Sequence, residues 1–180
     1  MRTLRLNLGF SMIEVLVTVV LICIGVLGMV AMQGRTIAYT QDSVQRNTAA
    51  MLADDLMEMM RADSSMVSTT GLPASSSGYY KAAGSNFPSA ATTCAPPPSS
   101  ASDRLGCWAE RAKAALPDAT SLLSSDFHVC RSATPGNCTS TGSAVEIQLA
   151  WRVKDGECMD ANAGTDDDKT ICHYRLRAEL

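Results

Sequence analysis

The chain begins with a long apolar stretch that contains very few polar positions. Between Phe10 and Met32 the only polar side chains are Ser11, Glu14 and Thr18. As a helix this stretch spans roughly 34 Å at about 1.5 Å per residue, which is enough to cross the hydrocarbon core of a bilayer. The pattern therefore predicts a membrane-spanning helix over 10–33.

A helical pattern continues beyond the apolar stretch, now with charged and amide side chains between the apolar ones. The apolar positions recur at near-helical spacing and are Ile37, Val44, Leu52, Leu56, Met59 and Met60. Such a stripe is typical of an amphipathic helix. We therefore expect one helix of roughly fifty residues, in which 34–62 packs its apolar stripe on the rest of the chain.

The remaining segment, 63–180, is predicted to form a globular domain outside the membrane. Ser64 to Ser102 is rich in Ser, Thr, Ala, Gly and Pro and shows little periodicity, which predicts an irregular connection. Tyr79, Tyr80 and Phe87 are its candidate anchors in the core. A short amphipathic helix that Pro117 ends should follow. Its apolar positions are Leu105, Trp108, Ala109, Ala112 and Leu116.

Three strands are expected in the last third of the chain, at Phe127–Arg131, Val145–Lys154 and Ile171–Leu180. The second strand alternates, so it should bury one face and expose the other. Its apolar side is Val145, Ile147, Leu149, Trp151 and Val153, and its polar side is Glu146, Gln148, Arg152 and Lys154. The expected inner face of the third strand is Cys172, Tyr174, Leu176 and Leu180. The predicted fold class is α+β, with a small antiparallel sheet.

Composition limits the partners and the chemistry. The formal net charge is −3 with two histidines, and the charges are scattered, so no basic surface indicates a nucleic-acid partner. The sequence contains neither a G-x-S-x-G motif nor a phosphate-binding glycine loop followed by Lys and Ser or Thr. We therefore expect no enzyme and no cofactor.

Six of the seven cysteines lie in the polar C-terminal half, and Cys23 lies in the apolar stretch. An even set in a loop-rich region is typical of disulfides in an oxidising compartment. A zinc site is disfavoured because no C-x-x-C pair occurs. Six cysteines allow fifteen pairings, and proximity within hairpins favours the sequential set. These pairs are Cys94–Cys107, Cys130–Cys138 and Cys158–Cys172.

Two further groups of residues are candidates for a catalytic or metal site. His128 and His173 each lie in a strand close to a cysteine, but disulfide cysteines beside incidental histidines are favoured over a Cys/His nucleophile. Asp160, Asn162 and Asp166 have a spacing similar to that of a calcium loop. The segment lacks the downstream bidentate Glu of an EF-hand, so a solvated acidic hairpin loop is the favoured interpretation and no metal is expected.

The residues around the start of the apolar stretch resemble a known processing signal. Arg2 and Arg5 precede it, which places the N-terminus in the cytoplasm and the globular domain across the membrane. A basic leader ending in Gly9, then Phe10, then Glu14 five residues into an apolar helix resembles the class III signal of type IV pilins and type II secretion pseudopilins. A conventional signal peptide fits less well, since no small-x-small cleavage site follows.

About the first 63 residues indicate which subtype of pilin the chain resembles. The segments EVLVTVVLICIGVLGMVAMQ and MLADDLMEMMRAD are similar to minor pilins of the PilV type. Ala31 stands where major pilins carry a helix-kinking proline, which disfavours a bulk structural pilin. The similar minor pseudopilin of type II secretion is the nearest alternative.

The resemblance implies a set of properties for this chain. Prepilin peptidase would remove the leader, 1–9, by cleavage between Gly9 and Phe10, and Phe10 would be N-methylated. Loss of Arg2 and Arg5 would change the net side-chain charge from −3 to −5. A long N-terminal helix on a small antiparallel sheet is implied, as are an inner-membrane precursor and a mature subunit in the pilus. The implied partners are other minor pilins and the major pilin, in pilus initiation, twitching motility and adhesion.

Glu14 needs a physical explanation, since an ionised carboxylate within hydrocarbon costs a few kcal/mol unless it is paired. Cleavage creates a partner, the α-amino cation of Phe10. On one helix this amine and Glu14 are about one turn apart, so they are able to pair within the chain. In the family, the implied pairing is with the amine of a neighbouring subunit, which sets the register of stacked helices. Both pairings stay open at this point.

Two interpretations outside pilus assembly and secretion remain. The chain could be a membrane-anchored extracytoplasmic binding module that keeps residues 1–9 or is cut near Gln33. A secreted, disulfide-rich enzyme ranks last, because no catalytic constellation supports it.

Overall fold

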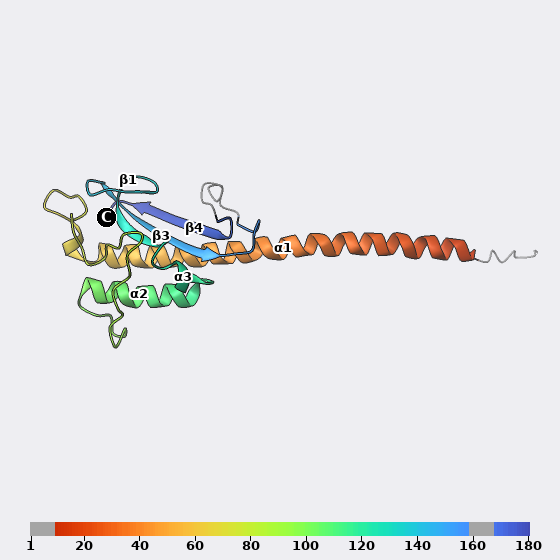
Figure 1. Ribbon diagram of the computed structural model, residues 1–180, viewed down its shortest axis with the longest axis horizontal. Helices are drawn as coiled ribbons and strands as arrows, with labels where there is room; N and C mark the ends of the chain where they lie inside the picture. Colours follow the sequence, from red (N-terminus) through yellow and green to blue (C-terminus); the bar gives the residue numbers. More distant parts are fainter. Residues whose placement is uncertain (1–9, 159–167) are drawn as a thin grey trace, which may run out of the picture. The chain divides into compact units, whose positions relative to one another are not determined.

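The computed structural model describes residues 10–158 and 168–180. The chain forms two compact units, Met1–Thr40 and Gln41–Leu180, and each is described by itself. Helix α1, Met12–Arg61, runs through 50 residues and contributes to both units (Figure 1). The long N-terminal helix predicted from the sequence is thus confirmed.

The first unit consists of the apolar part of α1. By length and composition this part is able to cross a membrane, with a mean hydropathy of 2.9 over its most apolar window. Its threonine hydroxyl groups are satisfied within the helix: Thr18 Oγ1 donates to the carbonyl of Val15 at 2.8 Å, Thr36 Oγ1 to that of Met32 at 3.1 Å, and Thr40 Oγ1 to that of Thr36 at 2.8 Å. Such back-bonding lets a threonine lie in apolar surroundings without an unpaired donor.

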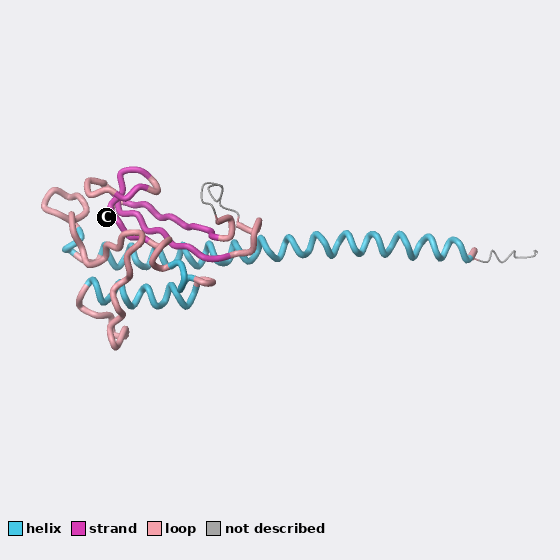
Figure 2. Tube along the Cα trace, in the orientation of Figure 1, coloured by secondary structure: helices cyan, strands magenta, loops and turns pink. Residues whose placement is uncertain are grey.

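The second unit is an α+β domain (Figure 2). Its sheet is antiparallel throughout, with the strand order β2-β1-β3-β4. In Figure 1 the sheet lies on one side of the C-terminal part of α1 and α2 lies on the other. The remaining elements are η1 (Ser64–Met66), α2 (Ala101–Ala115), α3 (Ala119–Leu122), β1 (His128–Thr134), β2 (Asn137–Cys138), β3 (Ala144–Arg152) and β4 (Ile171–Ala178).

One face of α1 is buried in the core of this domain, and it agrees with the stripe expected from the sequence from Leu52 to Met60 but not at Ile37 and Val44. Ile37 and Val44 are 59% and 55% exposed, whereas Asp42 is buried. The buried stripe contains the small residues Ala49 and Ala53, which contribute little to a hydrophobic pattern. The buried apolar positions of α1 are Ala49, Ala53, Leu56, Met57 and Met60.

Strand β3 also differs from its prediction. The alternating pattern indicated one buried and one exposed face, but every residue from Ala144 to Trp151 is buried. Glu146 is 0% exposed and Gln148 is 7% exposed. The turn between β1 and β2 covers the polar face, since the backbone N–H of Gly136 donates to the Glu146 carboxylate at 2.9 Å. The alternation of apolar and polar residues along a strand does not show whether another segment packs on the polar face.

The other strand predictions hold with shifted ends. The expected strand Phe127–Arg131 is observed one residue later and longer, as β1, and the two-residue β2 was not expected. Strand β4 ends at Ala178 rather than Leu180. Cys172, on its expected inner face, is buried, and three further side chains of that face pack on the core while remaining partly exposed. These three are Tyr174, Leu176 and Leu180.

Helix α2 occupies the segment predicted as a short amphipathic helix. Ser100 caps its start, because its hydroxyl accepts from the Asp103 N–H at 3.1 Å. Trp108 Nε1 donates to the carbonyl of Leu52 at 2.9 Å, which joins α2 to α1. A Cβ on Gly106 would lie 2.6 Å from the carbonyl oxygen of Ser89, so the preceding segment approaches α2 more closely than any side chain would allow.

The irregular segment after η1 is held by a buried lysine. The backbone of Lys81 exchanges two hydrogen bonds of 2.8 Å with Val129 of β1. Its ammonium group donates to the carbonyls of Leu123, Ser124 and Phe127 at 2.7, 2.8 and 2.6 Å. Burial lowers the pKa of Lys81 to about 8. One side chain therefore satisfies three carbonyls of the turn before β1.

Replacing Lys81 should destabilise the domain. Lys81→Met keeps the length of the side chain but leaves the three carbonyls without their donor, which should lower the free energy of unfolding by about 2–4 kcal/mol. Lys113→Met on α2 is the matched control, because Lys113 forms only an exposed pair with Glu110, and it should change stability by less than about 0.5 kcal/mol. Urea unfolding followed by tryptophan fluorescence measures both variants, and equal midpoints would contradict the assigned role.

Candidate functional site

The N-terminal end of α1 carries the residues that the sequence singled out for processing and assembly. Phe10 precedes the helix and is 84% exposed. The backbone N–H groups of Glu14 and Val15 donate to the carbonyl of Ser11 at 3.0 and 3.3 Å. Glu14 thus lies in the first helical turn, where the helix dipole favours a negative charge. Gly9 lies outside the described residues.

Glu14 is the one acidic residue between Phe10 and Met32, and its side chain is exposed. Among residues 10–158 and 168–180, its carboxylate has no ion-pair partner. The nearest positive group implied by the sequence is the amine that cleavage before Phe10 would create. Without that amine, or a positive group on another molecule, an ionised Glu14 would be unpaired once the helix lies in an apolar environment.

The cysteines of the second unit form three disulfides, and these are the sequential pairs expected from the sequence. Cys94–Cys107 attaches the irregular segment to α2. Cys130–Cys138 joins β1 to β2, and Cys158–Cys172 joins the chain after β3 to β4. Cys23 in the first unit is free. The cross-links tie segments with little regular structure to the sheet and to α2.

His128 belongs to a buried polar network on the covered face of the sheet. Its Nε2 lies 3.0 Å from Glu146 Oε1, and Ser132 Oγ donates to Glu146 Oε2 at 3.2 Å. Together with the Gly136 N–H these contacts satisfy a fully buried carboxylate. Burial lowers the pKa of His128, and the hydrogen bond that its ring donates to the Glu146 carboxylate opposes that shift. The network fixes the turn between β1 and β2.

Neither histidine is placed for nucleophilic chemistry. A nitrogen of His128 and the sulfurs of Cys130 and Cys138 lie within 4.8 Å of one another, but the two sulfurs are bonded in a disulfide and offer no thiolate. His173 Nε2 lies 3.5 Å from Asp126 Oδ1, and the neighbouring Cys172 is bonded to Cys158. The disulfides therefore account for the cysteines beside both histidines.

The candidate calcium loop lies mostly outside the described residues, and this includes Asp160, Asn162 and Asp166. Asp168, at its end, is described. Its carboxylate contacts Arg152 Nη1 at 3.0 Å and accepts from the Thr170 N–H at 2.9 Å. Asp168 thus stabilises the start of β4 and forms an ion pair with Arg152.

Two features of the second unit were not found by sequence reasoning. The first is the buried Asp42 on α1, whose Oδ1 accepts from Trp151 Nε1 at 3.2 Å. Arg46, one turn later, lies 3.8 Å from the same carboxylate and 5.6 Å from the centroid of the Trp151 ring. Asp42 and Arg46 have the spacing of an ion pair on a helix. This spacing is the only sign in the sequence of their contact with Trp151.

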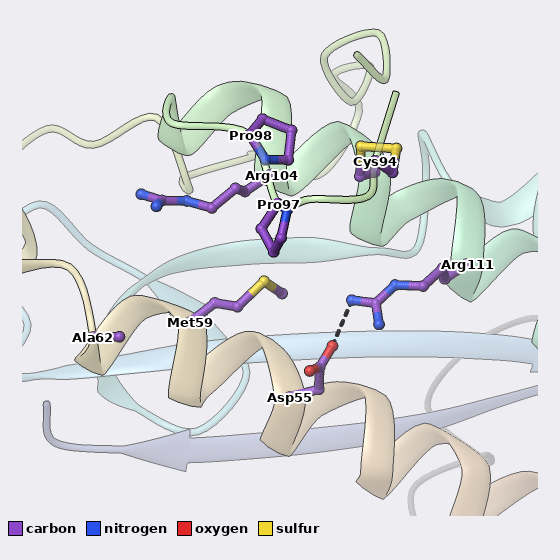
Figure 3. Close-up of a pocket in the computed structure, with 9 residues that line it drawn as sticks. Asp55, Met59, Ala62, Cys94, Pro97, Pro98, Arg104 and Arg111 are labelled. Carbon is purple, nitrogen blue, oxygen red and sulfur yellow. Dashed lines mark hydrogen bonds and ion pairs between the residues drawn. A yellow bond between two sulfur atoms is a disulfide. The ribbon is translucent and has the colours of Figure 1, made fainter. Parts of the chain in front are cut away.

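The second feature is a pocket between α1, α2 and the segment before α2 (Figure 3). Its volume is about 410 Å³. Met59 rises from α1 toward Pro97, and the Cys94–Cys107 disulfide forms part of the wall. The walls come from α1 and from 94–111, which are far apart in the sequence, so no local pattern indicates the pocket.

Arginine–aspartate pairs lie at the pocket. Arg104 Nη2 lies 2.5 Å from Asp63 Oδ2, and both side chains are largely buried. Arg111 Nη2 lies 2.6 Å from Asp55 Oδ2, and there the side chains are 58% and 44% exposed. The second pair is drawn as a dashed line in Figure 3.

Comparison of the chain with family models, with curated proteins and with solved structures finds no match.

The buried His128 predicts a pH dependence of stability. The unfolded chain takes up a proton near the ordinary histidine pKa of about 6.5, whereas folded His128 resists protonation until a lower pH because its pKa is lowered. The unfolded state therefore binds more protons in that window, and stability should fall as the pH drops below about 6.5. Urea midpoints at about pH 7.5 and 5 should differ more for the natural chain than for His128→Gln. Identical pH slopes in the two proteins would show that His128 does not contribute.

Proposed function

We propose that this chain is a minor pilin of the PilV type, made as a membrane-anchored precursor and assembled into a type IV pilus after cleavage between Gly9 and Phe10. The observation that carries the proposal is Glu14. It is a carboxylate in the first turn of an apolar helix, it has no ion-pair partner among the described residues, and it follows a Gly-Phe sequence at the spacing of the class III signal.

A positive partner for Glu14 explains why the acid is tolerated. Cleavage would produce the α-amino group of Phe10, about one helical turn away on the same chain. Pairing within the chain would neutralise both charges but leave the helices free to slide past one another. Pairing with a neighbouring subunit would neutralise them only in one register, which suits a filament, and we favour this arrangement.

The architecture agrees with this proposal without requiring it. A 50-residue N-terminal helix and a small disulfide-linked α+β domain are what the resemblance to pilins implies. Apart from the neighbouring helix backbone, no atom of the described residues lies within 4 Å of a Cβ built on Gly25 or Gly28 of α1. Their small size is therefore available for close approach by another helix.

The proposed partners follow from the helix. Prepilin peptidase would process the precursor in the inner membrane, and the helix would then pack with other minor pilins and with the major pilin at pilus initiation. Twitching motility and adhesion are the cellular processes that such a pilus would serve. A minor pseudopilin of type II secretion would use the same helix in the same way and remains the alternative. A membrane-anchored binding module is favoured separately by the pocket beside Met59.

The mass of the N-terminal peptide tests the processing step. Protein purified from cells that contain prepilin peptidase should yield a peptide that begins with methylated Phe10. Protein from cells without the peptidase should retain Met1 and is the matched control. A start at Met1 in both cells, or a start after Met32, would contradict the proposal.

Substitution of Glu14 tests its role in assembly. Glu14→Val should leave cleavage intact, because the cleaved bond is unchanged, and should strongly reduce incorporation into filaments, because the register-setting charge is lost. Thr18→Val is the control, since it removes a polar group one turn later that bonds only within the helix. Immunoblots of sheared pili measure incorporation. Equal amounts of both variants in the pili would argue against pairing between subunits.

A further inference from the structure

The pocket beside Met59 has a surface suited to a flat apolar group. Met59 forms one side, Pro97 and Pro98 form the opposite side, and the Cys94–Cys107 disulfide lies in the wall (Figure 3). Thioether and disulfide sulfurs are polarisable and make favourable contacts with aromatic rings. Proline rings are apolar and rigid, so they lose little conformational freedom when an aromatic ring packs on them.

The charged residues of the pocket differ in how easily they exchange partners. Arg104 is held by Asp63 at 2.5 Å, and its guanidinium carbon lies 5.5 Å from the centroid of the Tyr79 ring. Arg111 is bound only by the exposed Asp55. An exposed ion pair contributes about 0–1 kcal/mol, so exchange of Asp55 for another carboxylate costs little. Arg111 is therefore the cation that a ligand is able to recruit.

We infer that this pocket binds a small aromatic carboxylate, with its ring between Met59 and Pro97 and its carboxylate on the guanidinium of Arg111. Guanidinium groups form charge-assisted, bidentate hydrogen bonds with carboxylates. The volume of about 410 Å³ lies in the range of small-molecule sites. Each guanidinium of the lining is paired with an aspartate, and only the pair of Arg111 with Asp55 is exposed enough for a ligand carboxylate to replace the aspartate.

This inference does not rest on the proposed role in pilus assembly. Every residue of the pocket belongs to the second unit, whereas Phe10 and Glu14 belong to the first. Failure of the ligand experiment leaves the processing experiment unaffected, and a chain that is not processed still has the pocket.

The experiment uses the full chain in detergent micelles, labelled with ¹³C at the methionine methyl groups, and indole-3-propionate as the probe. The Met59 methyl signal, assigned with Met59→Leu, should shift on titration while that of the buried Met66 stays in place. Tryptamine has the same ring with an amine in place of the carboxylate and should cause no shift at equal concentration. Titration of empty micelles corrects for partition of the probe. Equal shifts with both compounds, or no shift with either, would overturn the inference.

Variants of the ion pair give effects of opposite sign. Arg111→Gln should weaken binding of indole-3-propionate about fivefold or more, because the cation is lost. Asp55→Asn should strengthen it about threefold, because the competing carboxylate is removed. Lys113→Gln, on the same helix but not in the lining, should leave the affinity unchanged. A structural role of the ion pair would instead make both pocket variants weaker binders, and that result would overturn the inference.

A peptide distinguishes a small molecule from a protein ligand with the same chemistry. Acetyl-Asp-Trp-Gly-amide presents a carboxylate beside an indole ring on a peptide backbone. Weaker binding of this peptide than of indole-3-propionate would support a small-molecule site. Tighter binding of the peptide would overturn that assignment and identify a docking site for an acidic aromatic segment.

Discussion

The second unit depends on the burial of one face of α1 in its apolar core. Ala49, Ala53, Leu56 and Met60 lie on this face, and each is 0% exposed. The same helix receives α2 on another side through the hydrogen bond from Trp108 to the carbonyl of Leu52. The apolar core of this domain therefore surrounds a single helix, and the loops and disulfides are arranged around it.

Buried polar side chains hold the segments that lie outside the apolar core. Buried Glu146 accepts hydrogen bonds from the turn after β1. Buried Lys81 donates hydrogen bonds to the turn before β1. The disulfides act on similar segments by limiting the unfolded chain. In a domain with the sheet on one side of α1 and α2 on the other, such contacts replace the additional core that a larger protein would have.

Local patterns predicted much of this structure, and the errors share one cause. The long helix, the three main strands, α2 and the sequential disulfides all follow from periodicity and proximity in the sequence. The burial of Asp42 and Glu146, and the exposure of Val44, depend on which distant segment covers each residue. The pocket could not be predicted for the same reason, since Met59, Pro97 and Arg111 come from three segments. In contrast, Glu14 was recognisable because an acid in an apolar stretch is unusual whatever surrounds it.

The close contact at Gly106 bears on how the cysteines find their partners. Because its missing side chain admits the backbone at Ser89 and Ala90, packing of this segment on α2 is compatible with a bond between Cys94 and Cys107. This packing therefore favours that pair among the fifteen combinations that six cysteines allow. The identity of one glycine thus contributes to the fidelity of oxidative folding.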